Sequence, residues 1–93
     1  MELKERAMAG TLESSDIYII VEPASSVAIE LESEVLAQFG DSIKEIMLDT
    51  LKELDVTGIK IVAKDKGAID PVIKSRLQTA VLRASKVKKY EWK

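Results

Sequence analysis

The chain has 93 residues, of which 46% are hydrophobic and 32% are charged, a composition typical of one compact globular domain. Fourteen Lys and Arg residues face 16 Asp and Glu residues, so the net charge is -2 and no nucleic-acid partner is expected. Cysteine and histidine are both absent from the sequence, which excludes disulfides, a thiol nucleophile and the commonest general base and metal ligand, and predicts a cytosolic protein without its own catalytic centre or metal site.

The first fifteen residues show no sustained hydrophobic period. They contain Gly10, Thr11, Ser14 and Ser15, and their charged start is not followed by an apolar stretch with a cleavage site. We therefore expect residues 1–15 to be a mobile or loosely docked leader without a signal peptide, and residues 16–93 to form a single domain. Apolar runs in the chain stay well short of the roughly 20 residues that a membrane-spanning helix needs, so no membrane partner is expected.

Two β-strands are predicted directly after the leader. The run 17–21 is rich in β-branched residues and ends at Pro23, which cannot donate a ladder hydrogen bond. Residues 27–32 alternate, with apolar side chains on one face and Glu30 and Glu32 on the other. Because only a short segment separates the two runs, the pattern predicts that they pair as a hairpin.

A long amphipathic helix is expected next. Apolar residues recur at helical spacing up to Asp55, and Ser33 suits the capping position at the start. Gly40 interrupts the pattern at a cost of about 1 kcal/mol relative to alanine, and Asp41 could instead cap a helix that begins there. The sequence therefore leaves the start of this helix open.

A third strand over residues 59–64 and a second helix over residues 70–85 complete the predicted elements. The turn 65–67 joins them, and Asp70 followed by Pro71 is typical of a cap and a first helical turn. The order β-β-α-β-α predicts an α+β fold, in which a small three-stranded sheet carries both helices on one face. A short tail, residues 90–93, follows the second helix.

Three further segments invite a functional interpretation, and a structural one is preferred for each. Asp41-Ser42-Ile43 resembles the Asp-Ser-Leu signature at which conventional acyl carrier proteins bear phosphopantetheine, but two strands precede it here, and helix capping is the simpler explanation. Residues 65–70 lack the spacing of a phosphate loop or a calcium loop and are explained by a turn and a cap.

The third segment is basic and is expected to be a solvated helix face rather than a binding surface. It comprises Lys74, Arg76, Arg83, Lys86, Lys88 and Lys89. Trp92 in the tail is kept apart from this interpretation, because an aromatic residue on a charged tail often anchors into a pocket.

The leader contains the sequence Ala9-Gly10-Thr11-Leu12-Glu13-Ser14-Ser15-Asp16. By composition alone Ser14 is an ordinary loop serine. However, Ala-Gly-Thr-Leu-Glu-Ser followed by a small residue and Asp, directly before a strand, resembles the attachment motif of the citrate lyase acyl carrier (gamma) subunit. The resemblance continues at matching separations over nearly all of the chain, in Gln38-Phe39-Gly40-Asp41, Asp65-Lys66-Gly67-Ala68-Ile69-Asp70, Arg76-Leu77 and Arg83-Ala84-Ser85.

The resemblance implies that Ser14 bears a phosphoribosyl dephospho-coenzyme A group through a phosphodiester. The family commonly has glycine or another small residue without a hydroxyl after the modified serine, so Ser15 is a second candidate, and we prefer Ser14. A chain without cysteine needs such a group to carry an acyl thioester, because the group brings the thiol that the sequence lacks.

The resemblance further implies a non-catalytic carrier subunit of citrate lyase. It would hold acetyl and citryl thioesters while partner transferase (alpha) and lyase (beta) subunits convert citrate to acetate and oxaloacetate, after a prosthetic-group transferase has attached the arm. The alternatives are a carrier subunit of malonate decarboxylase or citramalate lyase, and a cofactor-free module that binds another protein through its sheet face or the Trp92 tail. An independent hydrolase using Ser14 is disfavoured, because no recognisable base accompanies it.

Overall fold

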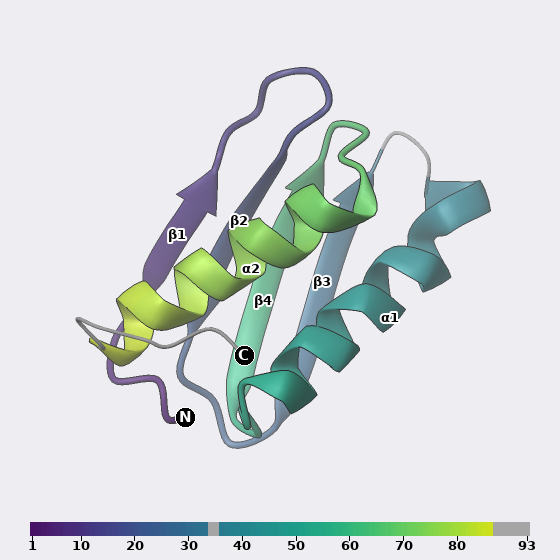
Figure 1. The fold of residues 1–93 in the computed structure, drawn as a ribbon. Helices are drawn as coiled ribbons and strands as arrows, with labels where there is room; N and C mark the ends of the chain where they lie inside the picture. Colours follow the sequence, from purple (N-terminus) through teal and green to yellow (C-terminus); the bar gives the residue numbers. More distant parts are fainter. Residues whose placement is uncertain (34–35, 87–93) are drawn as a thin grey trace.

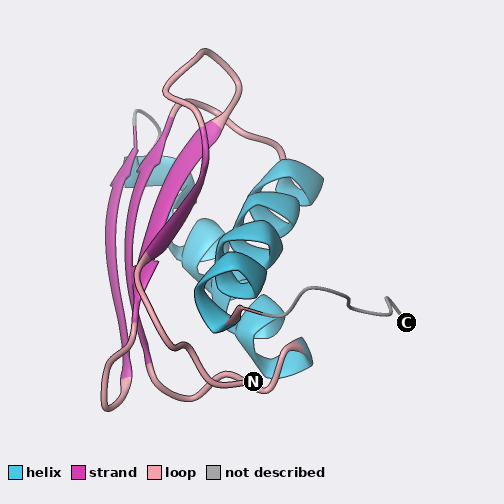
Figure 2. Ribbon diagram, turned by 90° about the vertical axis from the view of Figure 1, so that its left-hand side faces the viewer, coloured by secondary structure: helices cyan, strands magenta, loops and turns pink. Residues whose placement is uncertain are grey.

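A four-stranded sheet forms one layer of the fold and two helices form the other (Figure 1). The computed structural model describes residues 1–33 and 36–86, in the order β-β-β-α-β-α. Its elements are β1 (Ala7–Gly10), β2 (Ile17–Glu22), β3 (Val27–Ser33), α1 (Leu36–Glu53), β4 (Ile59–Asp65) and α2 (Asp70–Ser85). Both helices cover the same face of the sheet (Figure 2), which confirms the predicted α+β class and layer arrangement.

The sheet has one strand more than predicted, because residues 7–10 form an edge strand. This strand β1 pairs antiparallel with β2, from Ala7 opposite Val21 to Gly10 opposite Tyr18. Before it, Leu3 is buried in the core, and the backbone N–H groups of the next two residues donate to the carbonyl of Ala84. The prediction that the fold begins only after residue 15 is therefore wrong: the small residues of β1 carry no clear period, and their pairing with β2 makes them a strand.

Strand β4 lies between β2 and β3, so the predicted hairpin does not form. The sheet order is β1-β2-β4-β3, with β4 antiparallel to β2 and parallel to β3. The loop 23–26 passes the start of β4, where the N–H of Ile59 donates to the carbonyl of Ser26 at 3.1 Å and a Cβ on Gly58 would overlap the carbonyl oxygen of Ala24. Strands with one strand between them lie about 10 Å apart, a distance that four residues can span.

Helix α1 begins at Leu36 and runs through Gly40 without a break. Asp41 and Ser42 consequently lie inside the helix and not at a cap. Ser33 ends β3, where its hydroxyl donates to Oδ2 of Asp65 at 2.8 Å. The capping roles predicted for these three residues are therefore wrong.

Helix α2 begins and ends within one residue of the prediction. Ile69 occupies the cap position, Asp70 opens the first turn, and Pro71 follows where its missing N–H costs no intrahelical bond. Asp70, the predicted cap, therefore lies one residue inside the observed cap. At the other end Lys86 adopts a left-handed conformation, with φ 61°, and its N–H donates to the carbonyl of Arg83. The predicted roles of Lys88, Lys89 and Trp92 fall outside the described residues.

The core lies between the sheet and the helices. Alternate side chains of the two central strands point toward the helices, where the apolar stripes of α1 and α2 cover them. Burying one such side chain fully contributes about 1.5–3 kcal/mol. The apolar residues of β2, β4, α1 and α2 that are fully or almost fully buried are Ile17, Ile19, Val21, Ile43, Met47, Leu51, Ile59, Ile61, Ala63, Ile73, Leu77, Ala80, Val81 and Ala84. Within the described part of the chain, neither helix has the length and apolar character to cross a membrane.

Candidate functional site

Ser14 lies in the loop that joins β1 to β2. The N–H of Asp16 donates to the carbonyl of Glu13 at 3.2 Å, so residues 13–16 form a tight turn with Ser14 and Ser15 at its two central positions. Both serines are exposed, and the Ser14 hydroxyl makes no hydrogen bond to any residue that the structure describes. A modifying enzyme can therefore reach this hydroxyl without first breaking an intramolecular bond.

Ser15 differs from Ser14 in its backbone. Its φ is 65°, in the left-handed region, which costs a residue other than glycine roughly 1–2 kcal/mol. Its N–H donates to the carbonyl of Lys66 at 2.8 Å, which holds this half of the turn against the end of β4. The left-handed conformation gives a physical reason for the glycine that the resemblance leads one to expect after the attachment serine.

Lys66 extends the pairing of β2 with β4 into the turn. Besides accepting a hydrogen bond from Ser15, its backbone donates one to the carbonyl of Asp16, at 2.9 Å. Just before it, Asp65 accepts a hydrogen bond from the N–H of Ala68 at 3.0 Å and thereby shapes the loop 65–69. The turn predicted over residues 65–67 is thus also a support for the Ser14 turn.

Asp16 ties the turn to helix α2. Arg76 donates from Nε to Oδ1 at 3.0 Å and from Nη2 to Oδ2 at 2.9 Å, a bidentate arrangement. Thr11 donates its hydroxyl to Oδ2 at 2.7 Å, and the N–H of Ile17 donates to Oδ1, also at 2.7 Å. Asp16 is only 9% exposed, so four hydrogen bonds compensate the burial of its charge.

These donors stabilise the ionised form of Asp16. The hydrogen bonds from Arg76, helped by those from Thr11 and Ile17, outweigh the effect of burial and lower the pKa of Asp16 from 3.8 to about 2. The carboxylate is therefore charged throughout the physiological pH range, and the loop stays tied to α2.

Gly10 sets the direction in which the chain leaves β1. Its φ is 92°, and a Cβ at this position would overlap the carbonyl oxygen of Ile17. Only glycine fits where the two strands approach so closely. Gly10 and Thr11 therefore have structural roles in the motif, whereas Leu12 is 55% exposed.

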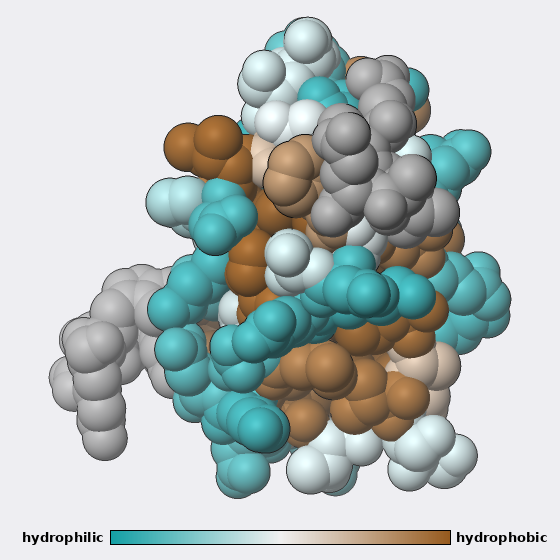
Figure 3. Space-filling view, turned by 90° about the vertical axis from the view of Figure 1, so that its right-hand side faces the viewer, coloured by the Kyte–Doolittle hydropathy of each residue, from teal (hydrophilic) through white to brown (hydrophobic). Residues whose placement is uncertain are grey.

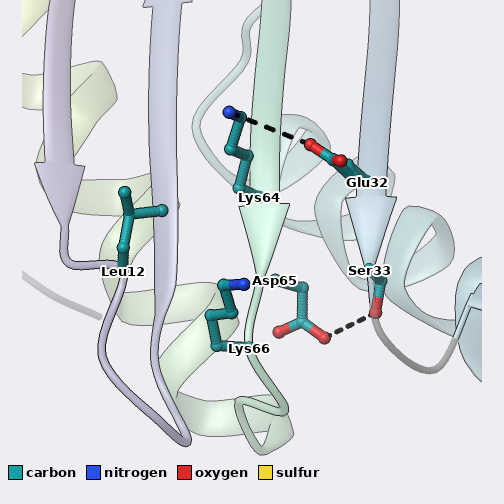
Figure 4. A pocket seen from close by; sticks show the side chains of 6 residues that line it. All are labelled: Leu12, Glu32, Ser33, Lys64, Asp65 and Lys66. Atoms are coloured by element: carbon teal, nitrogen blue, oxygen red, sulfur yellow. Dashed lines mark hydrogen bonds and ion pairs between the residues drawn. The ribbon is translucent and has the colours of Figure 1, made fainter.

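A hollow of about 270 Å³ opens beside the turn, at the end of the sheet. Figure 4 shows Leu12 on the Ser14 loop, Lys64 and Lys66 at the end of β4, and Ser33 at the end of β3. Lys64 forms an ion pair with Glu32 at 3.9 Å, and the buried Asp65 completes the lining. The two lysines place positive charge next to the loop that carries Ser14.

The other predicted candidates lie apart from this turn. Ser42 is on α1, beside a different groove that is described below. Arg76 and Arg83 were predicted to belong to a solvated helix face. Arg83 is exposed as predicted, although it also donates to the carbonyl of Met8 at 2.8 Å, whereas Arg76 is half-buried and binds Asp16. One feature of the sequence pointed to these two arginines: both lie in segments, Arg76-Leu77 and Arg83-Ala84-Ser85, that resemble the same family as the attachment motif at matching separations.

Comparison with known proteins gives consistent results. Residues 4–84 match the family model described as the malonate decarboxylase delta subunit, an acyl carrier family. The chain is 46% identical to the citrate lyase acyl carrier protein of Streptococcus mutans serotype c, over 100% of this chain and 93% of that protein. It is 50% identical to the protein of the same name from Lacticaseibacillus casei, over 99% of this chain and 92% of that one.

The fold also occurs in a solved structure. A chain in the crystal structure of a Pseudomonas malonate decarboxylase hetero-tetramer in complex with malonate matches with a TM-score of 0.75, over 90% of this chain and 88% of that chain. Its sequence identity to this chain is 21%, so the match shows a shared fold.

Proposed function

Since this chain belongs to the citrate lyase acyl carrier protein family, we propose that its prosthetic arm is phosphoribosyl dephospho-coenzyme A, attached at Ser14. The role that membership gives the chain is that of a non-catalytic acyl carrier, which bears a covalently attached group and works with partner subunits in a complex. The identity of the arm, its attachment point, the transferase (alpha) and lyase (beta) subunits as partners, and a cytoplasmic location are parts of the proposal.

The choice of Ser14 over Ser15 follows the attachment motif, and it is supported by an exposed hydroxyl in a turn that is held in place. Asp16 and Lys66 fix the turn, so a transferase that recognises it has little loop ordering to drive. A large group attached at the Ser14 hydroxyl displaces no hydrogen bond among the described residues. The residues present therefore fit a bulky phosphodiester-linked group at this position.

When attached, the arm supplies the thiol that a chain without cysteine cannot provide. The chain itself presents Ser14 and holds the turn in one conformation through Asp16. Lys64 and Lys66 offer positive charge to the phosphates near the root of the arm. A tethered thiol reaches two active sites at a high effective concentration, which suits a carrier that serves two catalytic subunits.

The proposal is tested by intact mass of the chain co-expressed with its modification enzymes, followed by peptide mapping of residues 7–22. We expect an added mass equal to that of the phosphoribosyl dephospho-coenzyme A group on Ser14, lost in Ser14→Ala and kept in the matched controls Ser15→Ala and Ser42→Ala. The same adduct on Ser15 would move the site by one residue. A phosphopantetheine mass on Ser42 would identify a conventional carrier, and no adduct under competent conditions would favour a cofactor-free interaction module.

A malonate decarboxylase carrier is the second candidate, because the matching family model and the matching structure both bear that enzyme's name. The identity of 44–50% to citrate lyase acyl carrier proteins favours the first candidate. The two are separated by adding the modified chain to the other subunits of each complex. Restored citrate cleavage supports the proposal, whereas restored malonate decarboxylation would contradict it; citramalate is the further substrate to compare.

A further inference from the structure

A second hollow, apolar and larger, lies on the helix side of the same end of the molecule. We call it the helix-start groove. Phe39 and Ile43 of α1 form one wall, and Ile69, Pro71 and Ile73 at the start of α2 form the other. Its volume is about 520 Å³, within the usual range of small-molecule sites.

Two large apolar side chains of this groove are unusually exposed. Phe39 is 51% exposed and Ile69 is 66% exposed. Figure 3 shows brown side chains reaching the surface at the upper end of the molecule, where the helices begin. A groove with exposed apolar walls is typical of a binding site, because covering those walls removes apolar surface from water.

The helix-start groove adjoins the Ser14 turn. Asp65 lines both the groove and the smaller hollow that contains Lys64 and Lys66. The loop 65–69 forms part of the groove. Within this loop, the backbone of Lys66 makes hydrogen bonds to the backbone of Ser15 and of Asp16. A group rooted at Ser14 therefore begins at a turn that only the loop 65–69 separates from this groove.

We infer that the helix-start groove holds the uncharged pantetheine end of the arm attached at Ser14, an inference that rests on the proposed function. Asp70 lies at the groove, and the described lining of the groove includes no basic residue. The charged phosphates of the arm are therefore disfavoured there. The lysines lie instead in the neighbouring hollow. This separation of charge matches an arm whose root is anionic and whose far end is amide and apolar in character.

The consequence is that the thiol end of the arm rests against its own carrier between visits to the partner subunits. A small uncharged acyl group can enter the groove with the arm, whereas an acyl group that bears carboxylates is disfavoured next to Asp70. If the arm is docked for about four-fifths of the time, its thiol reacts with an external reagent about fivefold more slowly than a free arm.

The test is the rate at which a maleimide alkylates the thiol of the modified protein. Ile69→Asp removes an apolar wall and adds a charge, and it should stay folded because aspartate is a preferred residue at a helix cap. Leu48→Asp is the matched control: Leu48 is 44% exposed on α1 and does not line the groove. We expect alkylation about fivefold faster in Ile69→Asp than in the wild type, with Leu48→Asp unchanged.

A second readout does not depend on reactivity. Amide chemical shifts of the modified and unmodified wild-type chain are expected to differ at residues 39–43 and 67–73 as well as in the Ser14 turn. Intact mass is measured first in every variant, so a missing adduct counts against the proposed function and not against docking. With the adduct present, equal alkylation rates in all three proteins and shifts confined to the turn would overturn the docking. So would a loss of turnover in the assembled complex of Ile69→Asp without any change in thiol reactivity, because it would assign the groove to a partner subunit.

Discussion

The two ends of the sheet are held by different kinds of contact (Figure 1). At the Ser14 end, formed by the loops 11–16 and 65–69, two buried carboxylates accept hydrogen bonds from side chains and backbone: Asp16 and Asp65. At the far end, formed by the loops 23–26 and 54–58, the contacts recorded for the described residues are made to backbone carbonyls. Examples are the N-terminal amine with Asp55 at 2.6 Å and the N–H of Ile59 with Ser26 at 3.1 Å.

The difference indicates what each end has to do. Burying a carboxylate is unfavourable unless several donors compensate it, so a buried carboxylate holds its loop in the conformation that supplies those donors. The far end only connects strands, and backbone contacts suffice for that. Substitutions that remove a polar side chain should therefore be costly at the Ser14 end and mild elsewhere.

The largest effect is expected from Gly10→Ala. The added Cβ would overlap the carbonyl oxygen of Ile17 and force a left-handed φ on alanine, so we expect the free energy of unfolding to fall by about 3 kcal/mol or more. Gly67→Ala is the control: its φ is 91° but its Cβ would meet open space, and a loss of about 1 kcal/mol is expected. Urea unfolding measures both, and equal losses would contradict the close approach at Gly10.

The second-largest loss of stability is expected from Asp16→Asn. The amide loses the bidentate charge-assisted pairing with Arg76, and unfolding should become easier by about 2 kcal/mol. Glu53→Gln removes the carboxylate from another ion pair, that with Lys74 at 3.0 Å, where both side chains are largely exposed, and should cost less than about 0.5 kcal/mol. If the two variants unfold at the same urea concentration, the buried pair does not hold the Ser14 end as described.

Acid should weaken the same contact. Because the pKa of Asp16 is lowered to about 2 in the folded chain, its contribution is present above the unfolded pKa of 3.8 and is lost as the pH falls from there toward 2. With Arg76 40% exposed to solvent, we expect a loss of about 1–2 kcal/mol. The measurement is thermal unfolding of the wild type and of Asp16→Asn at pH values from about 5 down to about 2, a range that includes both pKa values. The difference in unfolding temperature between the two proteins should shrink as the pH falls, and a constant difference would contradict the assignment.

The smallest effect is expected from Ser15→Gly. Glycine adopts the φ of 65° without strain but loses more entropy on folding, so a net stabilisation of about 0.5 kcal/mol is expected. Ser25→Gly in the far loop is the counterpart: the φ of Ser25 is not positive, so glycine should destabilise by a similar amount. Chemical unfolding distinguishes the two signs, and peptide mapping of Ser15→Gly should still place the adduct on Ser14.

Much of the secondary structure could be predicted from local pattern. The runs that became β2, β3, β4 and both helices were recognised because hydrophobic period and turn residues depend on neighbours in the chain. Strand β1 was missed, since four residues with small side chains show no period that distinguishes a strand from a loop. The attachment role of Ser14 was predicted because the residues around it resemble a family motif, and not from any pattern of burial.

From the sequence alone one could therefore recognise both helices and three of the four strands, the apolar faces of these elements, and the serine that matches the attachment motif. Folding was needed to bring β4 between β2 and β3, to place Arg76 against Asp16 across 60 positions of sequence, and to form a groove between the two helix starts, next to the loop 65–69 that supports the Ser14 turn. The physical reason is that a hydrophobic period reports that a face is buried but not which partner buries it. A charged side chain likewise does not reveal, before folding, whether it will meet water or an opposite charge.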